Sequence, residues 1–132
     1  MKWWLLAAAI PVAVACTTVK EPDREAGARA YQQCYSCHAL EPGKNDLTGP
    51  TLYGVIGRRV AAEPGFDYSP ALLAFAAREP LWTRELIDRF ATDPEVLVPG
   101  TSMAYHGMSD ANARAALLDH LAQTSLSADN LL

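Results

Sequence analysis

Lysine and cysteine are scarce in this sequence, and no apolar run approaches the roughly 20 residues that cross a membrane. The 132 residues include three cysteines and 11 Lys and Arg against 15 Asp and Glu, for a net charge of −4. Three cysteines are too few for the disulfide framework of a small secreted protein. A mildly acidic chain lacks the clustered cations that phosphate contacts require, so we expect no nucleic-acid binding. The length and ordinary apolar content indicate one globular domain.

Strand patterns are also missing. No stretch alternates apolar and polar residues convincingly, so the sequence predicts an all-α fold. Four helices are expected where a capping residue precedes a helix-compatible run: from Asp23 through Tyr31, from Ser69 through Ala77, from Thr83 to the stop at Asp93 and Pro94, and from Ser109 onward. A glycine-rich loop is expected between the first two helices.

The first 15 residues have the pattern of an export signal. Lys2 precedes an apolar run over residues 3–14, which matches the positive start and short hydrophobic stretch of a signal peptide. A short transmembrane anchor is the alternative interpretation. Ala13 and Ala15 are small residues of the kind that signal peptidases accept before a cut, so residues 1–15 are predicted to be removed.

Cys16 follows this predicted cleavage site directly. The segment resembles the lipobox of bacterial lipoproteins, in which that cysteine is acylated and becomes the new N-terminus. We therefore expect lipidation at Cys16, a tether over residues 16–22 and the globular domain over residues 23–132. This predicts an exported bacterial protein held by a lipid anchor on the periplasmic side of a membrane. Simple cleavage at the same site is the alternative, and it leaves an odd thiol.

Residues 34–38 read Cys-Tyr-Ser-Cys-His, the C-x-x-C-H pattern of c-type haem attachment. Two thiols about one helical turn apart each add to one vinyl group of the haem, so Cys34 and Cys37 are predicted to form thioethers. His38 follows at once and is predicted to ligate the iron. A redox dithiol or half of a zinc site is the alternative for the two cysteines alone. However, the sequence has neither a second cysteine pair nor a βαβ pattern.

A second axial ligand must come from elsewhere in the chain. The candidates are Met103, Met108, His106 and His120. Met103 lies in a Pro-Gly stretch that suits a loop laid over a haem face, and a thioether ligand favours ferrous iron. A methionine that only fills the core is the alternative for either methionine.

From about residue 27 to residue 121 the chain resembles class I cytochrome c, specifically the mitochondrial cytochrome c group and its bacterial relatives. The matching residues occur in the family's order: Gly27, Tyr31, the haem motif, residues 49–52 (GPTL), Gly57, Arg58, residues 65–69 (GFDYS), Trp82, Asp93, Pro94, residues 99–103 (PGTSM) and Gly107. The resemblance implies the class I cytochrome c fold, with about four helices and loops wrapped around one covalent haem c.

The resemblance also implies roles for individual residues. Met103 corresponds to the distal iron ligand, while Met108 corresponds to a core position and His106 to a surface position. The carbonyl of Pro50 accepts the other N–H of His38, which orients the ring.

Other residues of the motifs correspond to haem surroundings. Arg58, Tyr68 and Trp82 correspond to hydrogen-bond partners of the haem propionates, and Phe90 and Thr101 border the side of Met103. In the family the first and last helices cross at a glycine. Gly27 matches that position, and His120 is expected to face it.

The function implied is that of a one-electron carrier, not an enzyme, whose haem iron cycles between Fe(II) and Fe(III). The alternatives are a haem enzyme or gas sensor with a displaceable distal ligand, and a fixed redox subunit of a larger membrane complex. Only Lys20 and Lys44 follow the signal segment, so docking through a ring of lysines is not expected. The expected partners are membrane-bound redox proteins, and the chain is expected to be a monomer.

Overall fold

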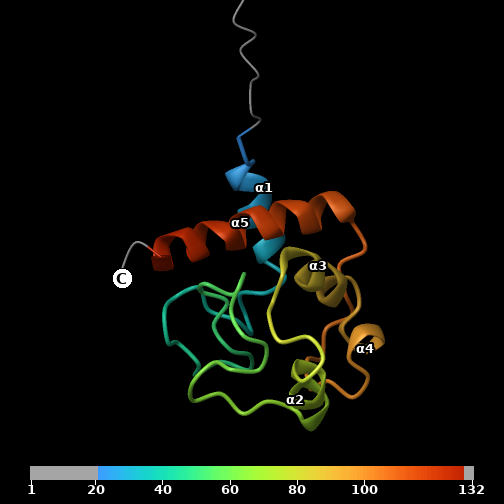
Figure 1. The fold of residues 1–132 in the computed structure, drawn as a ribbon. Helices are drawn as coiled ribbons and strands as arrows, with labels where there is room; N and C mark the ends of the chain where they lie inside the picture. Colours follow the sequence, from blue (N-terminus) through green and yellow to red (C-terminus); the bar gives the residue numbers. More distant parts are fainter. Residues whose placement is uncertain (1–20, 130–132) are drawn as a thin grey trace, which may run out of the picture.

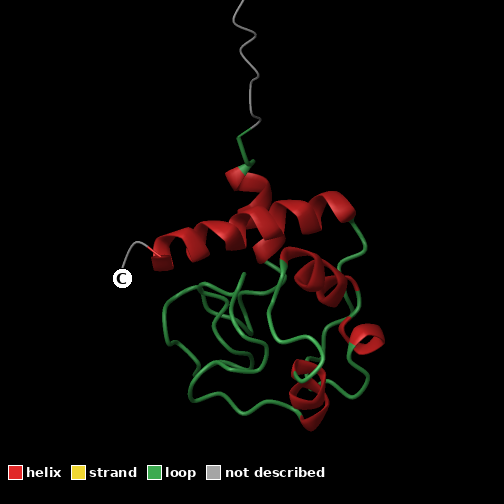
Figure 2. Ribbon diagram, viewed as in Figure 1, coloured by secondary structure: helices red, strands yellow, loops and turns green. Residues whose placement is uncertain are grey.

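The computed structural model describes residues 21–129. Within this range the chain forms five helices: α1 (Arg24–Tyr31), α2 (Pro70–Ala76), α3 (Arg84–Thr92), α4 (Pro94–Leu97) and α5 (Ala111–Asp129). The described residues contain no strand, only an isolated bridge between Arg59 and Leu81, so the all-α prediction is confirmed (Figure 2). The predicted signal peptide, Cys16 and most of the tether lie outside the described residues.

The first and last helices cross on one side of the molecule (Figure 1). Helix α5 packs against α1 and also against α3, and α3 in turn contacts the short α4. Helix α2 lies at the opposite end of the view, and the long connection between α1 and α2 fills the remaining side with irregular loops. The helices therefore frame a loop-rich half that carries most of the predicted site.

Three of the four expected helix starts are confirmed. The side chain of Asp23 accepts a hydrogen bond from the N–H of Ala26, that of Ser69 from Leu72, and that of Thr83 from Leu86. Each oxygen satisfies one of the N–H groups that a helix leaves without a partner in its first turn.

The start of the last helix was predicted one residue early. Asp110, not Ser109, accepts the N–H groups of Asn112 and Ala113, and α5 begins at Ala111. Both residue types are good caps, and they stand side by side in the sequence. The carboxylate of Asp110 makes both bonds and fixes the start of the helix.

Helix α4 was not predicted. Asp93 and Pro94 were interpreted as the end of α3, and α3 does end there, but the same two residues begin the next helix. The side chain of Asp93 accepts the N–H of Val96, and Pro94 occupies the first turn, where its missing N–H costs nothing. The chain therefore bends at Asp93 and continues as a single helical turn.

The predicted contact between Gly27 and His120 is confirmed at the crossing of α1 and α5. A Cβ added at Gly27 would lie 2.8 Å from both the carbonyl oxygen of Ala116 and the Cβ of His120. The Tyr31 and His120 rings lie 5.7 Å apart at the same contact. Only glycine lets the two backbones approach this closely.

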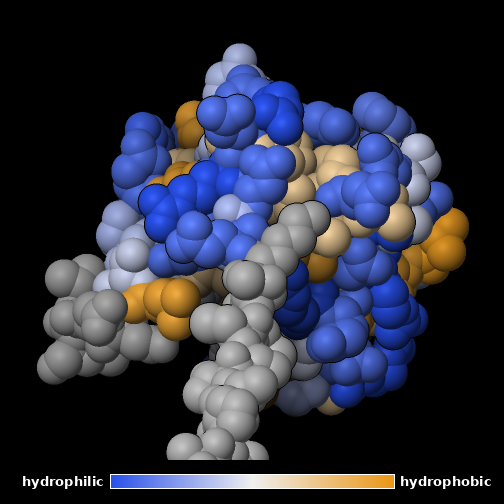
Figure 3. Space-filling model, turned by 90° about the horizontal axis from the view of Figure 1, so that it is seen from above, coloured by the Kyte–Doolittle hydropathy of each residue, from blue (hydrophilic) through white to orange (hydrophobic). Residues whose placement is uncertain are grey.

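The core lies between the helices and the loops and contains mostly aliphatic side chains and Trp82. Met108 is 3% exposed and belongs to this core, as expected, whereas His106 is exposed, also as expected. On the face of α1 and α5 seen from above, hydrophilic residues predominate and hydrophobic ones are scattered (Figure 3). None of the helices in residues 21–129 has the length and apolar character needed to cross a membrane.

Candidate functional site

The Cys-Tyr-Ser-Cys-His segment continues from the end of α1 as a series of turns. The N–H of Cys34 donates to the carbonyl of Tyr31, and the N–H groups of Cys37 and His38 both donate to the carbonyl of Cys34, at 3.0 and 2.9 Å. One turn of backbone therefore separates the two cysteines, which are both partly buried. This spacing is the one that two neighbouring vinyl groups of a haem require.

Burial makes Cys34 a poor acid. Loss of hydration, with a smaller contribution from nearby Cys37, raises the pKa of the Cys34 thiol to about 11. The site thus favours a neutral sulfur atom. A thioether has no charged form, so it suits this environment.

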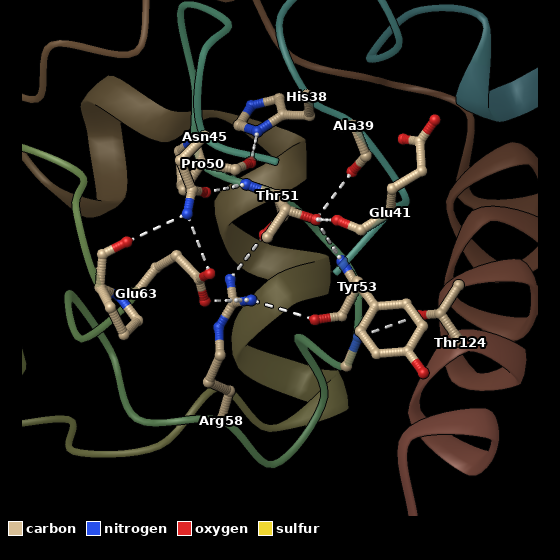
Figure 4. A network of polar contacts seen from close by, with 12 residues as sticks. His38, Ala39, Glu41, Asn45, Pro50, Thr51, Tyr53, Arg58, Glu63 and Thr124 are labelled. Carbon is tan, nitrogen blue, oxygen red and sulfur yellow. Dashed lines mark hydrogen bonds and ion pairs between the residues drawn. The ribbon is translucent and has the colours of Figure 1, made fainter. Parts of the chain in front are cut away.

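His38 is held in one orientation by the loop opposite it (Figure 4). Its Nδ1 lies 2.7 Å from the carbonyl oxygen of Pro50, which is the contact that the resemblance implied. A carbonyl only accepts, so Nδ1 carries the proton and Nε2 keeps its lone pair. Burial lowers the pKa of His38 against the opposing effect of the Pro50 hydrogen bond, which favours the neutral ring that a metal needs.

Gly49 gives the imidazole its room. A Cβ at this position would lie 2.3 Å from Cε1 of His38, so no other residue fits without moving the ring. The N–H of Gly49 donates to the carbonyl of Cys37 at 2.7 Å. This hydrogen bond therefore fixes the position of the Gly49–Pro50 loop relative to the Cys-Tyr-Ser-Cys-His segment.

The loop that carries Met103 is fixed by one internal hydrogen bond and by contacts with two other segments of the chain. The N–H of Met103 donates to the hydroxyl of Thr101 at 3.3 Å. Two residues later the hydroxyl of Tyr105 donates to the side chain of Gln33 at 2.7 Å, and Gln33 directly precedes Cys34. At the far end Gly107 has φ +91° and lies so close to Thr92 that a Cβ would stand 2.0 Å from its carbonyl oxygen. These contacts join the methionine loop to the motif segment and to the end of α3.

Two of the aromatic side chains expected around the haem, Trp82 and Phe90, pack against each other. The Trp82 ring lies 5.3 Å from that of Phe90 and 6.5 Å from that of Phe75. Trp82 is buried and Phe90 is partly buried. They form an apolar wall of the core between α2 and α3.

Arg58 lies in a polar network beside the His38 loop (Figure 4). Its guanidinium donates to the carbonyls of Thr51 and Tyr53 and forms an ion pair with Glu63 at 3.0 Å. Its Nε is buried and has no hydrogen-bond partner. The Tyr68 hydroxyl accepts the N–H of Glu63 at 3.1 Å. Two of the residues predicted to face the propionates thus both contact Glu63, Arg58 at its carboxylate and Tyr68 at its backbone N–H.

The residues present fit a covalently bound haem. The two thiols, the imidazole with its lone pair on Nε2, and the unpartnered Nε of Arg58 supply attachment, an iron ligand and a donor for a carboxylate. Within residues 21–129 no group of three or more His, Cys, Asp and Glu side chains could hold a metal ion by itself. The zinc alternative for the two cysteines therefore lacks a set of ligands in this part of the chain.

Sequence similarity to known proteins establishes the family of this chain. No family model matches the chain, but cytochrome c type-1 of Ascaris suum is 38% identical over 104 residues, which are 78% of this chain and 89% of that protein. Cytochrome c2 of Rhodopila globiformis is 38% identical over 88 residues, 67% of this chain and 79% of that protein. The chain belongs to the class I c-type cytochromes.

The fold of this cytochrome agrees with that assignment. Cytochrome cH from Methylobacterium extorquens superposes with a TM-score of 0.68 at 29% identity, over 76% of this chain and 98% of that one. The class I cytochrome c fold is thus confirmed. As a member of this family the protein binds one covalent haem c and is a haem-based electron carrier.

Sequence reasoning missed two residues of the site. Asn45 and Glu63 lie in the network around Arg58, yet neither belongs to a motif of the sequence. Asn45 reads as an ordinary loop residue and Glu63 as one acidic residue among many. Only the folding of two distant loops against each other brings them together.

Proposed function

We propose that this cytochrome is a one-electron carrier in which Cys34 and Cys37 would hold the haem and His38 and Met103 would ligate its iron. The observation that carries this proposal is the fixed orientation of the His38 imidazole, whose Nδ1–H donates to the carbonyl of Pro50. His38 follows Cys37 directly in the sequence. When bound, the haem supplies an iron ion that alternates between ferrous and ferric states. The chain itself needs no acid, base or nucleophile.

Arg58, Tyr68 and Trp82 are proposed to surround the haem propionates. The unpartnered Nε of Arg58 supports this role, because a buried N–H without an acceptor costs free energy that a carboxylate would recover. Phe90 and Thr101 are proposed to border Met103, and the hydrogen bond between Thr101 and the backbone of Met103 supports that placement.

A carrier differs from a haem enzyme or gas sensor in its sixth coordination position. We expect the ferrous protein not to bind carbon monoxide readily and the ferric protein to react slowly with hydrogen peroxide, because the Met103 side chain would already ligate the iron there. Optical titration should give one reversible one-electron wave. Rapid carbon monoxide binding by the native protein would instead favour the sensor or enzyme.

We further propose that the carrier is exported, tethered to a membrane through acylated Cys16, and passes electrons between membrane-bound respiratory or dehydrogenase partners as a monomer. A tether of about six residues keeps the domain within roughly 20 Å of its anchor at full extension. Such a carrier meets its partners by lateral diffusion, and it does not depend on long-range charge steering. Lys44 is the one lysine in residues 21–129, which agrees with this mode.

Cys16→Ser should release the protein from membranes. Two acyl chains anchor a protein firmly, whereas one chain binds only marginally. Cell fractionation should place the native protein in the membrane pellet and the variant in the soluble fraction, and mass spectrometry should find a diacylated N-terminus only on the former. Equal solubility of the two forms, together with an unmodified N-terminus, would support a free shuttle or a fixed subunit instead.

A further inference from the structure

The peptide group between Pro50 and Thr51 is hydrogen-bonded on both sides. Its carbonyl accepts from Nδ1 of His38 at 2.7 Å, and its N–H donates to Oδ1 of Asn45 at 2.9 Å. A peptide group that donates more strongly on one side becomes a better acceptor on the other, because hydrogen bonds in a chain polarise one another. The strength of the His38 hydrogen bond therefore depends on what lies behind Asn45.

A carboxylate lies behind Asn45. Nδ2 of Asn45 donates to Oε1 of Glu63 at 3.0 Å and also to the carbonyl of Pro64 at 3.1 Å. The Glu63 side chain is only 11% exposed, and its other oxygen pairs with Arg58, itself 18% exposed. The series His38, peptide 50–51, Asn45 and Glu63 is thus continuous and ends on a largely buried negative charge (Figure 4).

We propose that Glu63 is a positioning residue that sets the reduction potential of this cytochrome by acting through Asn45 and the 50–51 peptide on His38. The Glu63 carboxylate polarises the Nδ2–H bond of Asn45, so Oδ1 of Asn45 accepts the Thr51 N–H more strongly. The carbonyl oxygen of Pro50 then becomes more negative. Nδ1–H of His38 then donates more strongly, which makes Nε2 a better electron donor to a bound metal. A stronger donor favours the ferric state, so Glu63 lowers the potential. The inference rests on the proposed ligation of iron by His38.

Glu63 has a second route to the same centre through Arg58. Removing the carboxylate leaves the guanidinium charge without its partner, which by Coulomb's law also favours the ferrous state. A raised potential in a Glu63 variant alone therefore does not separate the two routes. Asn45 separates them, because Asn45→Ala interrupts the series and leaves the Arg58–Glu63 ion pair in place.

The experiment compares the haem-loaded native protein with Glu63→Gln, Asn45→Ala and the double variant. In the Glu63→Gln protein we expect the ferrous-to-ferric ratio at fixed ambient potential to rise threefold to tenfold, where tenfold is about 59 mV for one electron. Asn45→Ala should shift the ratio in the same direction, and Glu63→Gln should add less in its presence than alone. The Nδ1 proton resonance of His38 in the reduced protein should move upfield in each variant, because the hydrogen bond is weaker.

Glu41→Gln is the matched control. Its carboxylate lies on the same loop, is 65% exposed and pairs with Lys44 at 3.9 Å, so solvent screens its charge and neither observable should move. An unchanged potential and Nδ1 resonance in Asn45→Ala would overturn the proposal, as would equal effects of Glu63→Gln in both backgrounds. If Glu63→Gln does not fold, an unchanged potential in Asn45→Ala still overturns the proposal. A native protein without a low-spin spectrum would contradict the proposed ligation itself, separately from any role of Glu63.

Discussion

Met103→Ala is expected to open the distal side of the site and lower the reduction potential by on the order of a tenth of a volt, part of the roughly 0.8 V that axial ligands span. A thioether favours ferrous iron, so its loss favours the ferric form. The methionine-to-iron charge-transfer band should disappear, and added ligands should bind. Optical spectra, ligand titration and potentiometry measure the three effects.

Met108→Leu is the control for Met103→Ala. Met108 is 3% exposed in the core, and replacement by a side chain of similar volume costs less than about 1.5 kcal/mol. This variant should keep the band and the potential close to native. The opposite pattern, with the band lost in a Met108 variant and kept in Met103→Ala, would show that the distal ligand is assigned to the wrong methionine.

Replacing both Cys34 and Cys37 by alanine is expected to abolish covalent attachment almost completely. The two thiols are the only cysteines in residues 21–129, so no other thioether can form in the described part of the chain. Haem should then extract into acid acetone and vanish from a denaturing gel, whereas each single variant should keep one linkage. Cys16→Ser should retain the haem stain, and a stained double variant would contradict attachment at this motif.

Local signals were sufficient for much of the fold. Asp23, Ser69 and Thr83 could be predicted as caps because each acts on N–H groups within three residues. Ser109 was chosen wrongly because two good caps stand side by side, and sequence alone gives no reason to prefer the second. The turn at Pro94 was missed because proline ends one helix and begins another with the same geometry.

The haem motif could be predicted because its chemistry requires neighbouring residues. The contact of Pro50 with His38, which lie 12 positions apart, was predicted from the family resemblance and not from a local pattern. Glu63 and Asn45 are 18 positions apart in the sequence, and no periodicity links residues in two irregular loops. Pairings of this kind depend on how the loops fold together, which local pattern does not record.

The crossing of α1 and α5 has a consequence for the order of events in biogenesis. The motif cysteines leave the ribosome long before α5 exists, so the chain cannot close over α1 while the thiols emerge. Once the fold is complete, burial raises the pKa of the Cys34 thiol to about 11, so the reactive thiolate form is scarce at neutral pH. Haem attachment at Cys34 is therefore expected to be easier on a chain that is still unfolded, before the last helix docks.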